Sequence, residues 1–383
     1  MAHRRGEIYA AHGMRTMKVL SLFRKARSQP TPDASDQGAQ RAELERRIRE
    51  LTLRIEVNPH DPLAYYNRGV FYDGRRDFRQ AIADYGRVIA LIPLAPSAYV
   101  NRGADYLELG EHSRAMADFD RVIQLDPKLA VGYVNRAACH QRQGNHEKAW
   151  ADVTAALSVD PKCASAYVLR GELHAKNGDN ANAIEDASHA LEIDPELAAA
   201  FSLRGTAYFS TGELGSACAD MTKAMQLDPG YTNLLVPRGL SLAMSGRHLE
   251  GLDDLNRYVA LNPEDPEGHY HRGLVLFMSE RHAEAVEDFD RYIAAEPKAI
   301  DGYFSRSQAY SKMAKPDSAL KDLDAVLALA PDDAAALFRR GITHHEIGRR
   351  VEAIADIQRA LVLGLSSGMK ERAEELYQEL TST

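Results

Sequence analysis

The sequence predicts an all-α solenoid built from a repeated pair of helices, and three observations support this fold class. Nine prolines recur at intervals of 34 residues: Pro59, Pro93, Pro127, Pro161, Pro195, Pro229, Pro263, Pro297 and Pro331. Two other positions of the repeat always carry small residues, as two antiparallel helices require where they approach closely. Six repeats also place glycine between the two expected helices, where it ends the first one. A fixed period of this length indicates stacked supersecondary units.

The repeat frame begins three residues after each proline, so that repeat 1 covers 62–95 and repeat 9 covers 334–367. Position 8 is Gly, Ala or Ser in every repeat, and position 20 is Ala or Gly. Positions 4 and 24 mostly carry large aromatic or apolar residues, which would fill the space that the small residues leave. We therefore expect nine helix pairs between 62 and 367.

This pattern resembles the tetratricopeptide repeat, which has an aromatic residue at position 4, small residues at 8 and 20, an aromatic residue at 24 and proline at 32. Residues 64–69 (AYYNRG) and 81–89 (AIADYGRVI) carry the resemblance, and the match continues in phase through nine consecutive units. The resemblance implies a right-handed superhelical solenoid of helix-turn-helix units. In such a solenoid the first helix of each pair lines a concave groove.

The two ends of the chain differ from the repeats. Residues 1–40 are predicted to be a basic, disordered tail and linker, because 28–40 consist largely of small and polar residues. Residues 41–61 are expected to hold an N-terminal capping helix, in which Arg47 replaces the small residue of position 20. Residues 368–383 are expected to form a C-terminal capping helix with a polar outer face.

Repeat 6 is predicted to be the weakest unit. Pro237 falls within its first expected helix, where it should remove a hydrogen bond and kink the helix. Gly251 replaces alanine at position 20 of its second helix. Because stacked repeats couple only to their neighbours, a weak repeat is expected to divide the array.

Two charged positions recur in all nine repeats: arginine at position 7 and aspartate at position 23. They could form a ladder of anion-binding sites, or they could pair with each other within one repeat or between neighbouring repeats. Every interface needs its own polar pairing, whereas a ligand rarely needs nine copies, so we predict Arg–Asp ion pairs in at least six repeats. The residues are Arg68, Arg102, Arg136, Arg170, Arg204, Arg238, Arg272, Arg306 and Arg340, and Asp84, Asp118, Asp152, Asp186, Asp220, Asp254, Asp288, Asp322 and Asp356.

The sequence offers no catalytic, cofactor-binding or metal-binding pattern. HExxH, CxxC and glycine-rich phosphate loops do not occur in it. Cys139, Cys163 and Cys218 lack metal or redox spacing and are expected to be buried thiols. His344 and His345 are adjacent on a helix and cannot share a face. We therefore predict that the protein is not an enzyme and has no cofactor or metal.

A row of asparagines marks the candidate binding site in the expected groove. Asn67, Asn101 and Asn135 occupy position 6 of repeats 1–3, and an amide that both donates and accepts can hold a peptide backbone. The alternative is that asparagine merely belongs to the repeat consensus. Position 5 never carries Lys or Arg, which departs from the carboxylate clamp of chaperone-binding relatives. The predicted peptide-binding residues are Asn67, Asn101, Asn135, Tyr66, Val100 and Val134.

Two classes of function fit these observations. The favoured class is a non-catalytic scaffold or adaptor that binds an extended peptide or a helix of another protein in the groove. The alternative is a regulator that residues 1–30 target to a membrane surface or inhibit by docking on the array, since they hold seven Lys/Arg and one acidic residue. A disordered tail, or a start at Met14 or Met17, is a third interpretation of that segment.

The charge distribution bears on partners and location. Residues 1–61 hold 12 Lys+Arg and 8 Asp+Glu out of 47 and 55 in the whole chain, which leaves 62–383 with a net charge of −12. An acidic array disfavours binding to nucleic acid. No apolar run is long enough to cross a membrane, and no secretory signal is recognisable, so we expect a cytoplasmic protein.

Overall fold

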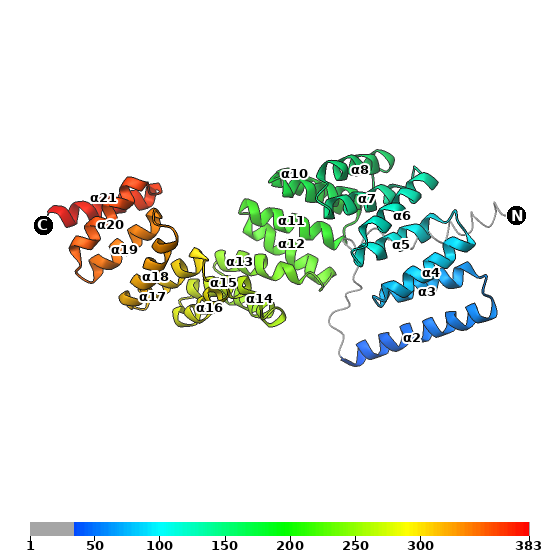
Figure 1. Ribbon diagram of the computed structural model, residues 1–383, viewed down its shortest axis with the longest axis horizontal. Helices are drawn as coiled ribbons and strands as arrows, with labels where there is room; N and C mark the ends of the chain where they lie inside the picture. The colour runs from blue at the N-terminus through cyan, green and yellow to red at the C-terminus, as the bar shows by residue number, and fades with distance from the viewer. Residues whose placement is uncertain (1–33, 383) are drawn as a thin grey trace. The chain divides into compact units, whose positions relative to one another are not determined.

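The structure, a computed structural model, describes residues 34–382. Within that range it contains twenty α-helices, one 3₁₀ turn and no strand, which confirms the prediction of an all-α repeat protein. The chain divides into two compact units, Met1–Thr232 and Asn233–Thr383. Within each unit the helix pairs follow one another in chain order, as the colours of Figure 1 show. The basic segment 1–30 lies outside the described residues.

The first unit contains a single helix followed by five helix pairs. They are α2 (Ala34–Val57); α3 (Pro62–Gly74) and α4 (Phe78–Leu91); α5 (Pro96–Glu108) and α6 (His112–Leu125); α7 (Ala130–Arg142) and α8 (His146–Val159); α9 (Ala164–Lys176) and α10 (Asn180–Ile193); and α11 (Ala198–Thr211) and α12 (Leu214–Leu227). Every first helix begins at position 1 of its repeat and every second helix covers positions 17–30, so the bounds follow the predicted frame.

The second unit contains four helix pairs followed by a single helix. A 3₁₀ turn, η2 (Thr232–Leu234), precedes α13 (Leu235–Met244) and α14 (His248–Leu261); then follow α15 (Pro266–Met278) and α16 (His282–Ala295), α17 (Ile300–Lys312) and α18 (Pro316–Leu329), α19 (Ala334–Glu346) and α20 (Arg350–Leu363), and α21 (Ser367–Ser382). Apart from α13, these helices keep the same frame.

The single helices at the two ends each bury one apolar stripe. Helix α2 buries Ile48 and Ile55, and α21 buries Ala373 and Leu380. Helix α2 begins at Ala34, seven residues before the predicted start at residue 41. Residues 34–40, which were predicted to belong to the linker, are therefore helical.

The two helices of a pair approach closely where position 8 is glycine. A Cβ atom on Gly103 would lie 2.6 Å from the ring of Phe119, and one on Gly69 would lie 2.8 Å from the ring of Tyr85. Both rings have no exposed surface. As predicted, the small residue at position 8 of the first helix leaves room for the large side chain at position 24 of the second helix in these pairs.

Repeat 6 departs from the frame, but Pro237 does not lie in the interior of a helix. The turn η2 replaces the first residues of the expected helix, and α13 begins at Leu235. Pro237 is therefore the third residue of α13, where a backbone N–H would have no acceptor within the helix. The predicted loss of a hydrogen bond was wrong for this reason. The division between the two compact units does fall in repeat 6, at its beginning.

Candidate functional site

The recurring arginines and aspartates pair within their own repeats. In all nine repeats the Nε and Nη2 atoms of the position-7 arginine donate to the two carboxylate oxygens of the position-23 aspartate, at 2.6–3.0 Å. The nine aspartates are only 2–8% exposed. These contacts confirm the predicted pairing and leave the carboxylates no surface for a ligand.

The same arginines also connect successive repeats, through position 25, which the sequence analysis had not singled out. Nη1 of Arg136 donates to Asp120 of the preceding repeat at 2.7 Å, and Nη1 of Arg340 donates to Asp324 at 2.6 Å. Arg204 reaches Ser188 in the same way, at 3.2 Å. Each of these guanidinium groups joins two helices of one repeat to the second helix of the repeat before it.

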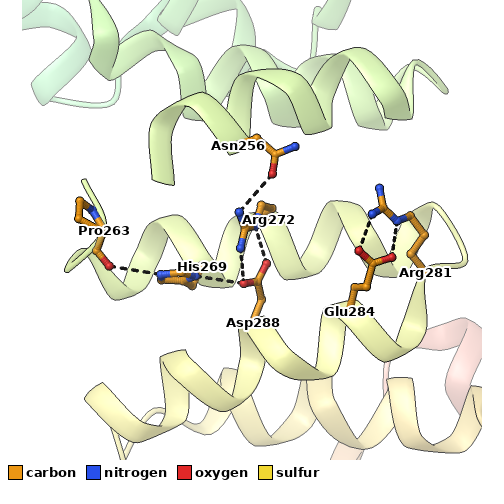
Figure 2. A network of polar contacts seen from close by, with 7 residues as sticks. All are labelled: Asn256, Pro263, His269, Arg272, Arg281, Glu284 and Asp288. Atoms are coloured by element: carbon orange, nitrogen blue, oxygen red, sulfur yellow. Dashed lines mark hydrogen bonds and ion pairs between the residues drawn. The ribbon is translucent and has the colours of Figure 1, made fainter. Parts of the chain in front are cut away.

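Repeat 7 shows how this network adapts to a substitution (Figure 2). His269 replaces the usual aromatic residue at position 4, and its ring nitrogens lie 3.0 Å from Oδ1 of Asp288 and 3.3 Å from the carbonyl oxygen of Pro263. In other repeats a tyrosine hydroxyl at position 4 bonds the corresponding proline carbonyl, as Tyr303 does with Pro297. The histidine therefore keeps that contact and adds one to the ion pair.

The predicted asparagine site is closed to a partner. Asn101, Asn135, Val100 and Val134 have no exposed surface, and Tyr66 is 8% exposed. Nδ2 of Asn101 donates to the Tyr66 hydroxyl at 3.0 Å, so these side chains bind each other. Only Asn67 is partly exposed. The prediction that the amides of Asn101 and Asn135 line an open groove is therefore wrong.

The burial of position 9 differs between repeats 2 and 3 and repeats 6 and 7. Ala104 and Ala138 stand there in repeats 2 and 3, and both are buried. The inner side chains of these two repeats, among them Asn101 and Asn135, are buried as well. Repeats 6 and 7 carry Leu240 and Leu274 at the same position, and both side chains stay partly exposed.

A half-buried carboxylate lies on the first helix of repeat 4. Glu172 of α9 accepts a hydrogen bond from Nε2 of Gln141 of α7, at 3.2 Å. Burial raises the pKa of Glu172, and the bond from Gln141 only partly opposes this shift. The ionised carboxylate therefore destabilises the folded state relative to an uncharged group of the same shape.

Replacement of Glu172 by glutamine is expected to stabilise the protein at neutral pH, on the order of 1 kcal/mol. The side-chain amide of the glutamine can still accept the hydrogen bond from Gln141. The substitution also removes a charge from a half-buried position. Because the folded-state pKa is raised, wild-type stability is greatest below the unfolded pKa and declines as pH rises through the folded pKa. The advantage of the glutamine variant should therefore be small near pH 4 and grow toward pH 8. Urea unfolding at several pH values measures it, and an advantage that shrinks with rising pH would contradict the prediction.

Three successive first helices of the second unit share a partly exposed apolar surface. It comprises six partly exposed side chains at positions 5, 9 and 12 of three successive first helices, and we call it the α13–α17 face. Its members are Val236 and Leu240 of α13, Tyr270, Leu274 and Phe277 of α15, and Phe304 of α17. The Tyr270 hydroxyl forms a hydrogen bond with Ser305, which joins α15 to α17 across this surface.

Carboxylates border the α13–α17 face where α15 and α17 begin. Glu267 and Asp301 both occupy position 2, and both are exposed. Glu264 and Asp265 lie in the connection from α14, separated from Glu267 by Pro266. The face therefore combines apolar side chains with an acidic border, an arrangement that the search for asparagines had not revealed.

Within residues 34–382, no group of three or more His, Cys, Asp or Glu side chains is placed to hold a metal ion. The three cysteines are free thiols. None of the helices in this range is long and apolar enough to cross a membrane.

The fold and the repeat contacts define an α-helical repeat protein, a class whose members typically act in protein interactions. Family models described as tetratricopeptide repeat match residues 96–129, 139–198, 198–231, 237–300 and 304–370. The chain therefore belongs to the tetratricopeptide repeat family. No curated protein sequence is significantly similar to it.

Solved structures of other repeat proteins share this fold. The Cut9–Hcn1 hetero-tetramer of the APC/C aligns with a TM-score of 0.51 at 15% identity, over 83% of this chain and 76% of the other. A tetratricopeptide repeat protein from Parabacteroides merdae aligns with a TM-score of 0.49 at 19% identity, over 66% of this chain and 99% of the other. At 15% identity the likeness to the Cut9–Hcn1 structure shows the fold alone.

Proposed function

We propose that this protein is a non-catalytic scaffold that binds a segment of a partner protein along the α13–α17 face. Tetratricopeptide repeat proteins in general bind other proteins, and that role is the starting point. We place the binding site on this face because its side chains are more exposed than the inner side chains of α5 and α7. The inner side chains of α5 and α7 are buried against each other, whereas those of α13, α15 and α17 stay partly exposed.

The composition of the α13–α17 face suits a peptide or a helix of a partner. Removing apolar surface from water contributes about 25 cal/mol per Å², and aromatic side chains often dominate such interfaces. Tyr270 and Phe304 provide aromatic surface, and Leu240 and Leu274 provide aliphatic surface beside it. Because the three helices belong to successive repeats, one bound segment can contact all of them.

Selection of peptides from a random display library against the full chain tests this proposal without a known partner. Peptides that bind are labelled, and their affinity is measured by fluorescence anisotropy. Leu274→Asp is expected to weaken binding by about tenfold or more, because it places a charge against the bound segment. Leu240→Asp provides a second variant at the same face. Thermal unfolding of each variant is used to check that it remains folded.

Leu249→Asp is the matched control. Leu249 lies on α14 outside the α13–α17 face and is 78% exposed, so the same substitution there should leave binding unchanged. Equal binding to wild type and to both face variants would contradict the proposed location. A library that yields no binder would contradict peptide binding itself.

A further inference from the structure

We propose that the α13–α17 face selects segments that carry lysine or arginine beside apolar residues, with a partner cation held between Glu267 and Asp301. This inference rests on the proposed function and adds the chemistry of the partner. It follows from three features of the acidic border: its uncompensated charge, the aromatic rings beside it, and the substitutions that place those rings there.

The negative charge of the border is not neutralised within residues 34–382. Asp301 forms no ion pair there, and the only one that Glu267 forms is with Nε2 of His271, at 3.9 Å. No lysine or arginine of the described chain pairs with either carboxylate. A cation from outside would therefore gain an attraction that the folded chain does not supply itself.

The two carboxylates border one pair of aromatic rings. Burial together with Glu267 and Asp301 raises the pKa of the Tyr292 hydroxyl to about 12. Burial also raises the pKa of Tyr270, with smaller contributions from the same two carboxylates. The ring centres of Tyr270 and Tyr292 lie 4.7 Å apart, and their planes are inclined by 32°. The Tyr292 hydroxyl lies 3.5 Å from Oε1 of Glu267, and the Tyr292 ring packs on Gly302, the residue after Asp301. Both carboxylates therefore border this pair of rings.

The rings add a second attraction for a cation. An ammonium or guanidinium group within about 6 Å of an aromatic face is drawn to it, more strongly where water is excluded. Tyr270 is partly exposed on the α13–α17 face, whereas Tyr292 is buried. Both phenols are uncharged at neutral pH, as an unperturbed tyrosine already is. A lysine or arginine side chain could therefore lay its apolar stem on the face and place its charge between the carboxylates.

Specific substitutions in repeats 6 and 7 create this site. Position 27 is tyrosine only in these two repeats, as Tyr258 and Tyr292, and it is valine or alanine in the other seven. Each tyrosine packs on a glycine at position 3 of the next repeat, and a Cβ atom on Gly302 would lie 2.8 Å from the Tyr292 ring. The Tyr258 hydroxyl donates to Oδ2 of Asp265 at 2.6 Å. The tyrosines thus bring aromatic rings to the acidic border at these junctions.

The test uses the full chain and a labelled peptide in which lysine alternates with leucine. A matched peptide carries glutamate in place of lysine. The lysine peptide is expected to bind at least about tenfold more tightly, and its affinity should fall as salt is added. In the double variant Glu267→Gln/Asp301→Asn, affinity for the lysine peptide should fall by roughly two- to twentyfold, as expected for two partly exposed ion pairs.

The control variant Asp253→Asn/Glu287→Gln removes the same number of charges elsewhere. Both residues are exposed at position 22 of second helices, so binding of the lysine peptide should not change. An equal loss in both double variants would overturn the inference, because it would reflect net charge alone. If Leu274→Asp abolishes binding of library peptides but Glu267→Gln/Asp301→Asn leaves the lysine peptide unaffected, the inference fails and the proposed function stands. If Leu274→Asp has no effect on either, the proposed function fails.

Discussion

Replacement of Arg102 by alanine is expected to destabilise the first unit by about 3 kcal/mol, because it leaves a buried carboxylate without its partner. Asp118 is 4% exposed, and it accepts bonds from Nε and Nη2 of Arg102 at 2.8 and 2.7 Å. Burial raises the pKa of Asp118, and Arg102 acts against that shift. Without the arginine the folded-state pKa should rise further, so the loss of stability should diminish toward low pH, where the carboxyl is protonated.

The matched control is Arg114→Ala, which removes an arginine from the exposed ion pair with Glu111. That change should cost less than about 1 kcal/mol. Urea unfolding followed by circular dichroism measures both variants. A cost for Arg102→Ala as small as that of the control would show that the repeated ion pairs do not hold the array together.

Replacement of Gly251 by alanine is expected to destabilise the second unit by about 1–3 kcal/mol, although alanine is the residue of the other repeats at position 20. A Cβ atom on Gly251 would lie 2.5 Å from the carbonyl oxygen of Gly239. Backbone cannot move aside as a flexible side chain can, so α13 and α14 would have to separate. The sequence had suggested that Gly251 weakens repeat 6, whereas the structure shows that the close approach of the two helices requires it.

Gly86→Ala provides the control for this prediction. Gly86 lies within α4, and a Cβ atom there would meet only the end of the Arg102 side chain, at 3.9 Å. Because alanine is the better helix former, this variant should be more stable by about 0.5–1 kcal/mol. Thermal unfolding is expected to show a lower melting temperature for Gly251→Ala and a higher one for Gly86→Ala. A stabilising Gly251→Ala would contradict this prediction.

The repeat frame could be predicted from the sequence because each repeat position recurs nine times. Three features follow from residues that must fit together within one repeat. They are the helix bounds, the pairing of position 7 with position 23, and the packing of the large Phe119 ring against the small Gly103. Contacts of this kind are local and depend on residue size and charge alone. They therefore appear in the sequence as a pattern.

The candidate site could not be predicted in the same way, because exposure depends on how closely successive repeats pack. Asn101 and Asn135 were expected to line an open groove, but both side chains are buried. The α13–α17 face arises from departures from the consensus, such as Tyr292 and Gly302. A search for recurring residues overlooks positions that matter because they do not recur.

Hydrogen exchange of the full chain, with and without a saturating library peptide, tests the central proposal most directly. Bound peptide is expected to slow exchange in α13, α15 and α17 and to leave α3, α5 and α7 unchanged. Slower exchange confined to α3, α5 and α7, the helices that carry Asn67, Asn101 and Asn135, would contradict the assignment of the binding surface to the α13–α17 face.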